Sequence, residues 1–269
     1  MSEVKQDLKK ENFTHIIDLH SNLRSLQIKL FLPSAKILTY RKGTIAKWKR
    51  IYLKSSAPNI HVVDRYLKPL QKLDVFNDGK GLEFFIPTDT VIDWKTLGGK
   101  PGKYIAFVIG AAHFTKRLPN EKLAQICKGT NDPIYLVGGP DVQEVGHSLA
   151  QQFDHVINTC GLLSFMESAR LIELSTAVIA QDTGFMHIAA ALRKPLISIW
   201  GSTDPQLGFW PLFPDQHGGL NHIEEVNDLS CRPCSKFGRS ACPKGHFKCM
   251  HNIHVEAIAQ KINTLSHEK

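Results

Sequence analysis

A carboxylate, a hydroxyl, a glycine and an imidazole lie close together in the sequence as Asp182, Thr183, Gly184 and His187. The apolar run 177–180 before them is typical of a buried strand, and the alanine-rich residues after them are typical of a helix. Where a parallel strand turns into a helix, unpaired backbone N–H groups and the positive end of the helix dipole face the edge of the sheet. These four residues therefore predict a site for an anionic ligand.

Three other interpretations compete with this one. Asp182 could serve only as the N-cap of the helix, and His187 could be a hydrogen-bonded histidine of the core. The triplet Asp182-Thr183-Gly184 is also the signature of aspartic proteases. That class is built from β-hairpins and needs a pair of triplets or a homodimer, whereas here the triplet opens a helix. We therefore favour the anion site.

A cation and a second hydroxyl follow an earlier predicted strand, 104–110. Lys116 and Thr115 lie in the loop after it, and glycine-rich loops follow two later predicted strands. Parallel strands bring such loops to one edge of a sheet, so Lys116 and Thr115 are candidates for contact with phosphate oxygens. The alternative is that Lys116 is only a solvated surface charge. The Gly-x-Gly-x-x-Gly and Gly-Lys-Ser/Thr motifs are absent from the sequence, which disfavours dehydrogenase and P-loop chemistry.

A cluster of cysteines near the C-terminus is a second candidate site. Its members are Cys231, Cys234, Cys242 and Cys249. In a reducing compartment such clustering predicts a structural zinc ion held by four thiolates. The second half of the cluster lacks a Cys-x-x-Cys pair, although His246 and His251 could substitute as ligands. The alternatives are reduced buried thiols or a disulfide.

Strand and helix patterns alternate along the chain, which predicts an α/β fold with parallel sheets covered by helices. Proline and glycine residues within 87–102 mark a boundary between domains 1–90 and 91–269. The predicted strands are 15–19, 36–40, 83–86, 104–110, 134–137, 177–180 and 196–200. The predicted helices are 5–12, 23–32, 41–54, 59–73, 119–128, 141–152, 164–174, 186–192 and a last helix containing 253–262.

Two helix starts in the second domain match the capping-box pattern. Asp141 is followed by Glu144, and Ser164 is followed by Glu167. We therefore interpret both glutamates as structural.

The composition is that of a soluble globular protein, with 42% hydrophobic and 22% charged residues. The sequence has no apolar run long enough to cross a bilayer, and residues 1–11 are polar and charged, so we expect no signal peptide and a cytoplasmic location. The net charge of +8 favours an anionic partner such as a nucleotide, a nucleic acid or an anionic lipid surface.

Part of the positive charge is concentrated in residues 41–54, which contain no acidic residue. Ile45, Trp48, Ile51 and Tyr52 follow helical spacing there, which predicts a basic amphipathic helix. Such a helix could rest on an anionic membrane. Alternatively, its apolar face packs on the core and its basic face is solvated.

Four motifs, taken in order and spacing, resemble glycosyltransferase family 9, the heptosyltransferases of lipopolysaccharide core assembly. They are residues 110–119, 136–140, 181–195 and 201–205, and the resemblance extends over about residues 13–260. The resemblance implies a GT-B fold, in which two Rossmann-like domains face a cleft and the C-terminal one holds a nucleotide-sugar donor. The cysteine cluster also looks like one found in members of this family.

Carried over by position, the resemblance assigns roles to individual residues. Lys116 and Thr115 would contact the donor phosphates, and Leu163 would lie near the base. The motif Asp182-Thr183-Gly184 would bind the diphosphate and the sugar, with His187 completing that shell. A diphosphate leaving group needs a cation and helix N–H groups where its charge develops, which agrees with the chemistry of these side chains.

The family pattern begins with a strand and a glycine-aspartate loop, whose aspartate is thought to deprotonate the acceptor hydroxyl. The matching part of this sequence begins after that loop, so we expect a truncated N-terminal domain without the usual base. Asp18, His20 and Arg24 would line the remaining acceptor side. Asp18 and His20 are candidates for the catalytic base and Arg24 for acceptor binding, while Asp18 could equally be a turn residue.

The predicted function is that of an inverting glycosyltransferase. It would transfer heptose from ADP-heptose to an acidic lipid A–core acceptor at the inner-membrane surface, by direct displacement at the anomeric carbon. No cofactor is expected for the chemistry, a structural zinc is possible, and no nucleic-acid partner is expected. One alternative is a nucleotide-sugar-binding protein without catalysis, because the base loop is absent. Another is a zinc-stabilised nucleic-acid binder with steeply salt-dependent affinity.

Overall fold

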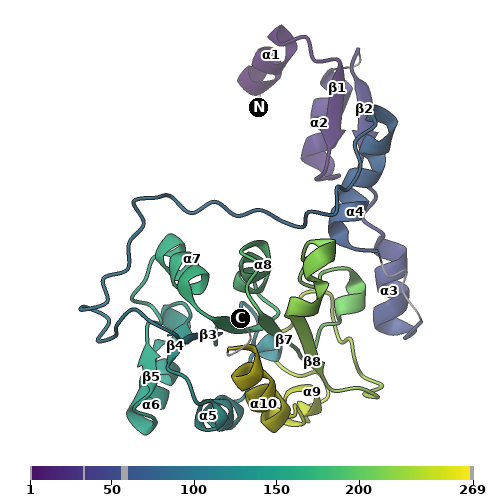
Figure 1. Cartoon of the computed structure of the whole chain (residues 1–269). Helices are drawn as coiled ribbons and strands as arrows, with labels where there is room; N and C mark the ends of the chain where they lie inside the picture. The colour runs from purple at the N-terminus through teal and green to yellow at the C-terminus, as the bar shows by residue number, and fades with distance from the viewer. Residues whose placement is uncertain (1, 33, 56–59, 267–269) are drawn as a thin grey trace.

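A six-stranded parallel sheet forms the centre of the C-terminal part of the chain (Figure 1), in a computed structural model that describes residues 2–32, 34–55 and 60–266. The strand order is β5-β4-β3-β6-β7-β8. The strands are β3 (Ile105–Val108), β4 (Ile134–Val137), β5 (Val156–Asn158), β6 (Ala177–Gln181), β7 (Leu196–Trp200) and β8 (Asn221–Glu225).

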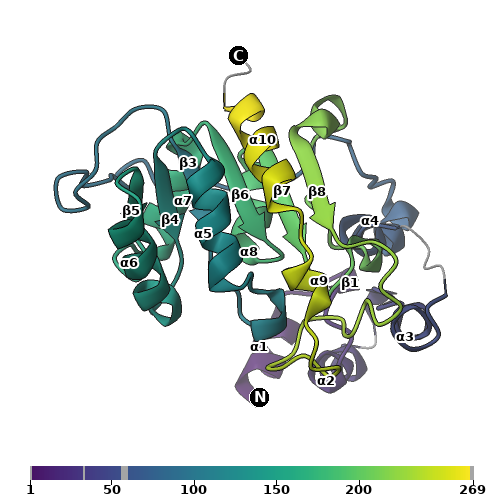
Figure 2. The same ribbon diagram turned by 90° about the horizontal axis from the view of Figure 1, so that it is seen from below.

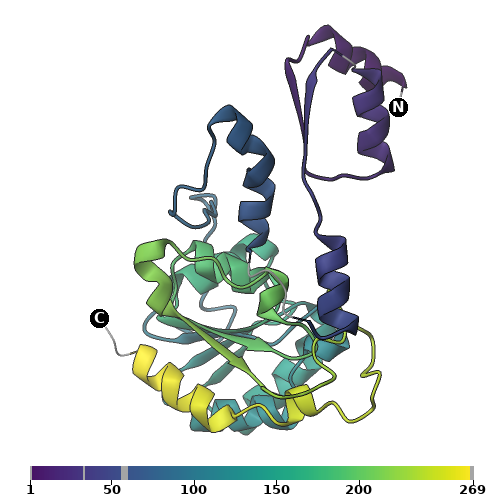
Figure 3. The same cartoon turned by 90° about the vertical axis from the view of Figure 1, so that its right-hand side faces the viewer.

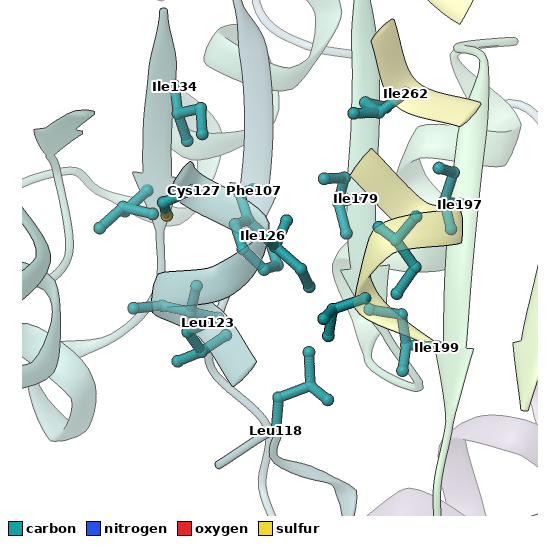
Figure 4. Packing of buried hydrophobic residues seen from close by; sticks show 14 of the residues in the cluster. Phe107, Leu118, Leu123, Ile126, Cys127, Ile134, Ile179, Ile197, Ile199 and Ile262 are labelled. Atoms are coloured by element: carbon teal, nitrogen blue, oxygen red, sulfur yellow. The ribbon is translucent and has the colours of Figure 1, made fainter. Parts of the chain in front are cut away.

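Helices cover both faces of this sheet, so every residue of β3, β4, β6 and β7 is buried. The strands are nearly continuous apolar runs for that reason. Figure 2 shows α5, α6 and α10 on one face, and Figure 4 shows Ile126 of α5 and Ile262 of α10 packed near Phe107 and Ile179 of the sheet. The helices of this face are α5 (Asn120–Gly129), α6 (Gln143–Gln152) and α10 (Val255–Leu265); those of the other are α7 (Phe165–Leu174) and α8 (Gly184–Ala191).

A smaller α/β unit precedes this domain. Its two parallel strands, β1 (His15–Asp18) and β2 (Lys36–Thr39), pack with α2 (Leu23–Phe31), and α1 (Ser2–Lys10) lies before them. Figure 3 shows this unit standing beyond α3 (Thr44–Tyr52), away from the large sheet.

The segment after the small unit joins the two parts of the chain. Arg50 of α3 forms an ion pair of 2.5 Å with Asp204, and His61 Nε2 lies 3.0 Å from the carbonyl oxygen of Trp210. His61 Nδ1 accepts a hydrogen bond from the N–H of Val63, so Nε2 carries the proton and donates to Trp210. His61 thereby caps α4 (Val62–Leu67) and ties it to the C-terminal domain.

The predicted α/β class with parallel sheets is confirmed, and most element bounds agree with the prediction within a few residues. The boundary predicted near residue 90 falls in an irregular connection, residues 74–104. The strand predicted at 83–86 is wrong: the segment is irregular, with Phe84 packed against Phe165 of α7, and it pairs with no strand of the described chain. The start predicted for the helix 59–73 lies outside the described residues.

The two capping predictions differ in outcome. The box at Ser164 and Glu167 is confirmed, since each side chain bonds the backbone N–H of the other residue. The box at Asp141 and Glu144 is wrong. A 3-10 turn over 140–142 precedes α6 and the carboxylate of Asp141 is taken by Arg117, so no side chain caps that helix.

Helix α3 is oriented opposite to the prediction of a core-packed apolar face. Two of its basic residues point inward: Lys47 is 5% exposed, and Arg50 is paired with Asp204, whereas Lys49 is exposed. Its apolar residues face outward, with exposed fractions of 74% for Ile45, 50% for Trp48 and 60% for Tyr52. The interpretation with a solvated basic face is therefore wrong.

Across the described part of the chain, no helix combines the length and the hydropathy needed to cross a bilayer.

Candidate functional site

The sheet has a switch point between its neighbouring strands β3 and β6. After β3 the chain enters α5 on one face, whereas after β6 it enters α8 on the other. The two loops diverge there and leave a crevice at the carboxyl edge, which is where ligands bind in open α/β sheets. Lys116 follows β3 and Asp182 follows β6, so the predicted convergence of these loops is confirmed.

Lys116 and Asp182 form an ion pair in this crevice. The Nζ atom lies 2.7 Å from Oδ2 and also donates to the backbone oxygen of Asp182 at 3.2 Å. The hydroxyl of Thr203 donates to the same Oδ2 at 2.7 Å. Because its carboxylate is committed to these partners, Asp182 is not the helix N-cap that one interpretation predicted.

The N-cap of α8 is Thr183, and its side chain makes no capping hydrogen bond. The first N–H groups of a helix have no partner inside the helix, so those of α8 remain available to a ligand. The Thr183 hydroxyl is enclosed yet has no hydrogen-bond partner within the described chain. A Cβ atom added to Gly184 would meet nothing within 4 Å, so the space beside that backbone is open.

These groups border a pocket of about 290 Å³. It contains five of the predicted donor-site residues, Lys116, Asp182, Thr183, Gly184 and His187. The complete lining is Ala112, Lys116, Asp182, Thr183, Gly184, His187, Trp200, Thr203, Asp204, Phe209, Lys236 and Phe237.

His187 lies one turn into α8 and is half-buried. Burial lowers its pKa below the usual value; the nearby Asp182 opposes this shift and Lys116 adds to it. The imidazole is therefore neutral near pH 7, when it can both donate and accept a hydrogen bond. No protein group within the described ranges bonds to the ring, so the alternative of a hydrogen-bonded core histidine is not supported.

Two predicted donor contacts lie elsewhere in this structure. Thr115 is 1% exposed, and its hydroxyl accepts hydrogen bonds from Ser202 Oγ and the N–H of Arg239, both at 2.8 Å. These hydrogen bonds connect the loop after β3 to the segments that contain Ser202 and Arg239, and Thr115 does not line the pocket. Leu163 packs against the core beneath α7 and α8 and does not line the pocket.

Sequence reasoning missed the other side of the pocket. Asp204 lies within the Gly201–Pro205 motif and Phe209 follows it, and the position of that motif after β7 was the available signal. Lys236 and Phe237 lie in the cysteine-rich segment. No local pattern places that segment beside Lys116, because the contact depends on a long-range arrangement.

The carboxylate proposed as a catalytic base has a structural role instead. Asp18 is 5% exposed; it accepts hydrogen bonds from the N–H of Ser21 at 2.7 Å and Ser25 Oγ at 2.9 Å, and it pairs with Lys29 at 2.7 Å. Burial raises its pKa, but these partners outweigh burial and lower the pKa to about 2. A carboxylate with that pKa is a poor base near neutrality, so these contacts argue against Asp18 as the catalytic base.

The other two acceptor-side candidates are exposed. His20 follows β1 with its backbone N–H bonded to Asp18, and Arg24 lies in the first turn of α2. Neither borders the Lys116 pocket.

The four clustered cysteines are all free thiols. Cys234 Sγ donates to the backbone oxygen of Cys231, whose own Sγ lies 3.9 Å from His246 Nε2. Burial raises the pKa of Cys249 to about 12; the three neighbouring thiols add to this rise, and the charge of Arg232 opposes it. Within the described residues, however, no three metal-ligating side chains are arranged to hold a metal ion. The four thiols lie in one region, and a structural zinc held there stays a prediction.

A parallel sheet with a crevice at its switch point and a smaller α/β unit attached is an arrangement of the GT-B type, so the predicted GT-B fold is confirmed. The family model for glycosyltransferase family 9 (heptosyltransferase) matches residues 1–236. The chain therefore belongs to this glycosyltransferase family.

Individual relatives agree with the family assignment. The chain is 29% identical to lipooligosaccharide heptosyltransferase 2 of Haemophilus influenzae over 282 residues, covering 95% of this chain and 77% of the relative. It is 35% identical to lipopolysaccharide heptosyltransferase 1 of Pseudomonas aeruginosa over 247 residues, covering 86% of this chain and 64% of the relative.

Two solved structures share the fold. The Escherichia coli ADP-heptose lipopolysaccharide heptosyltransferase II matches with a TM-score of 0.62 at 17% identity, covering 98% of this chain and 80% of that one. A family 9 glycosyltransferase from Veillonella parvula matches with a TM-score of 0.67 at 20% identity, covering 99% and 78%.

Proposed function

We propose that this chain transfers a heptose from a nucleotide diphosphate sugar, with ADP-heptose as the donor, to the lipopolysaccharide core. The observation that carries the proposal is the meeting of Lys116 with the uncapped start of α8 in one pocket at the switch point. The names of the relatives support heptose transfer, and the E. coli structural neighbour named for ADP-heptose supports this choice of donor.

The chemistry of the pocket fits the departure of a diphosphate. In direct displacement, the acceptor hydroxyl loses its proton to a base and its oxygen bonds to the anomeric carbon as the bond from that carbon to the diphosphate breaks, and the sugar centre is inverted. Negative charge then grows on the leaving oxygen. Lys116 and the N–H groups of α8 would stabilise that charge, because both lie fixed in place before the reaction.

Other residues would hold the donor. Asp182 keeps the ammonium of Lys116 at the pocket, and Thr183 has a hydroxyl to which no group of the described residues bonds. The neutral ring of His187 can bond a phosphate oxygen or a sugar hydroxyl.

The second candidate is a nucleotide-sugar-binding protein without catalysis. The commitment of Asp18 to Lys29 and Ser25 favours it, because that carboxylate is not free to take the acceptor proton. Measured sugar transfer separates the two functions.

Action at the inner-membrane surface, with a lipid A–core acceptor, is part of the proposal. The outward face of α3 supports it, since Trp48 and Tyr52 are residue types that partition to the membrane interface. Arg41, Lys42 and Lys49 are exposed basic side chains on and beside that helix, and they suit an anionic lipid surface.

The test is a transfer assay with ADP-heptose and a heptose-deficient lipid A–core acceptor, read by mass spectrometry of the glycolipid and by ADP release. The proposal predicts a heptosylated product in stoichiometric balance with ADP, strongly reduced in Lys116→Ala and retained in Lys128→Ala, which removes an exposed lysine of α5. Donor binding without product would support the non-catalytic candidate instead.

A further inference from the structure

The pocket around Lys116, the donor pocket, is contacted from outside by helix α3. None of the helix residues 44–52 lines the pocket, yet two of them touch residues that do. Arg50 pairs with Asp204, and Lys47 Nζ lies 4.8 Å from the ring centroid of Phe209. The pair of Arg50 and Asp204 joins residues that are 154 positions apart in the sequence.

The pair between Arg50 and Asp204 is the stronger of these contacts. Two guanidinium nitrogens of Arg50, Nε and Nη2, donate to Oδ2 of Asp204 at 2.8 and 2.5 Å. The other carboxylate oxygen accepts the N–H of Gln206 at 2.8 Å. The carboxylate is buried, and removing one partner of such a pair leaves the other as an uncompensated charge. Asp204 is therefore stable in this position only while Arg50 is present.

The residue before Asp204 belongs to the ion pair of the donor pocket. The hydroxyl of Thr203 donates to Oδ2 of Asp182 at 2.7 Å, and the same oxygen lies 2.7 Å from Nζ of Lys116. A single planar peptide unit joins Thr203 to Asp204, so a shift of one residue moves the other. The turn 203–204 thus connects Arg50 of α3 to the cation of the pocket.

The same turn is also held from within the C-terminal domain. Nε of Arg232 donates to the carbonyl oxygen of Gly201 at 2.6 Å, and its Nη2 donates to that of Thr203 at 3.0 Å. These bonds do not involve α3. Loss of Arg50 should therefore loosen the turn at Asp204 without unfolding the domain, and its effect should fall on the pocket.

We propose that Arg50 is a positioning residue for the donor site. It acts through the turn 203–204, which fixes the ion pair of Lys116 and Asp182 that would meet the diphosphate. The inference rests on the proposed function, because that function assigns a diphosphate to this pocket. A coupling between two sites is reciprocal, so ADP in the pocket stabilises in turn the docked position of α3, a helix that does not line the pocket.

Calorimetric titration of ADP into Arg50→Met tests the proposal. We expect the affinity to fall by on the order of tenfold, because a displaced ion pair loses part of its charge-assisted contact with the diphosphate. Arg50→Lys, which keeps the charge, should recover part of the loss. Lys49→Met, exposed on the same helix, should bind ADP as the unaltered protein does. So should Asp18→Asn, which loses a buried ion pair elsewhere and controls for reduced stability alone.

Thr203→Val separates positioning from a simple effect of charge. The variant removes the hydroxyl that joins the turn to Asp182. If Arg50 acts through the turn, Arg50→Met should weaken ADP binding much less in that background than in the unaltered protein, since effects within one network are not additive. Repulsion of ADP by an unpaired Asp204 would instead give the same tenfold loss in both backgrounds, and that result would overturn the positioning role.

Hydrogen exchange tests the coupling in the reverse direction. ADP should slow amide exchange in residues 44–52, and this protection should be lost in Thr203→Val. ADP binding that Arg50→Met leaves unchanged, or exchange in α3 that ADP leaves unchanged, would contradict this inference alone. No ADP binding to the unaltered protein would contradict the proposed function together with it.

Discussion

The ammonium of Lys116 lies 2.7 Å from the carboxylate of Asp182, joining the loops that follow two neighbouring strands of the sheet. Both side chains are largely buried, with exposed fractions of 14% and 10%. The pair therefore fixes a cation at the mouth of the crevice, next to the first turn of α8. A phosphate arriving there meets a preorganised charge and does not have to order a mobile lysine.

Asp182→Asn tests the structural side of this pair. The amide can still accept from Thr203, but it no longer neutralises Lys116, so we expect the free energy of unfolding to fall by about 1–3 kcal/mol. Chemical denaturation measures this loss. If the variant is as stable as the unaltered protein, the ion pair does not hold the loops together; a double-mutant cycle with Lys116→Met isolates the pairwise part.

Gly184→Ala separates binding from folding. Nothing in the free protein lies within 4 Å of the added methyl group, so stability should be preserved. A diphosphate approaching the start of α8 would meet that methyl group, and we expect ADP affinity to fall by roughly tenfold or more. Gly219→Ala is the matched control, because its Cβ position is also open and it is not in the pocket. Unchanged ADP affinity in Gly184→Ala would mean that the ligand does not approach this backbone.

Two histidines predict how stability depends on pH. Burial lowers the pKa values of both His61 and His187 relative to the unfolded chain, where histidine titrates near about 6.5. The unfolded state therefore binds more protons as the pH falls through that value, and stability decreases until the folded-state pKa is reached. Urea unfolding between pH 8 and 5 should show this decrease, and it should be smaller in His187→Gln. An identical pH dependence in the variant would contradict the lowered pKa of His187.

Asp18→Asn should damage folding and leave the donor pocket intact. The lowered pKa of about 2 implies a stabilising contribution on the order of 2 kcal/mol at neutral pH, present above the unfolded pKa and lost as the pH falls toward 2. Denaturation at pH 7 should show the loss, and ADP titration should show unchanged affinity. A variant of full stability that is defective only in transfer would restore Asp18 as a catalytic candidate.

Local patterns predicted most of the large sheet and the core of its site. The apolar runs of β3, β4, β6 and β7 identify buried parallel strands, and their polar ends indicate the shared edge. The edge strand β8 was missed, because its residues Asn221–Glu225 are largely polar and carry no apolar run. Lys236 was missed because its position depends on contacts between distant parts of the chain.

The orientation of α3 shows the limit of amphipathic patterns. The spacing of Trp48 and Tyr52 predicts a helix with two unlike faces, but it does not say which face meets the protein. Arg50 pairs with Asp204, and Lys47 lies over the ring of Phe209. Both partners lie far along the chain, and these two contacts turn Arg50 and Lys47 toward the protein. The face of α3 that packs on the protein is therefore set by tertiary contacts and not by the local sequence pattern.

Calorimetric titration of ADP into the unaltered protein, Lys116→Ala and Lys128→Ala tests the central claim most directly. The account predicts saturable ADP binding, weakened by about 10- to 100-fold in Lys116→Ala through loss of a charge-assisted contact of about 1.5–3 kcal/mol, and unchanged in Lys128→Ala. No binding to the folded protein, or equal affinity in Lys116→Ala, would contradict the assignment of this pocket to a nucleotide diphosphate.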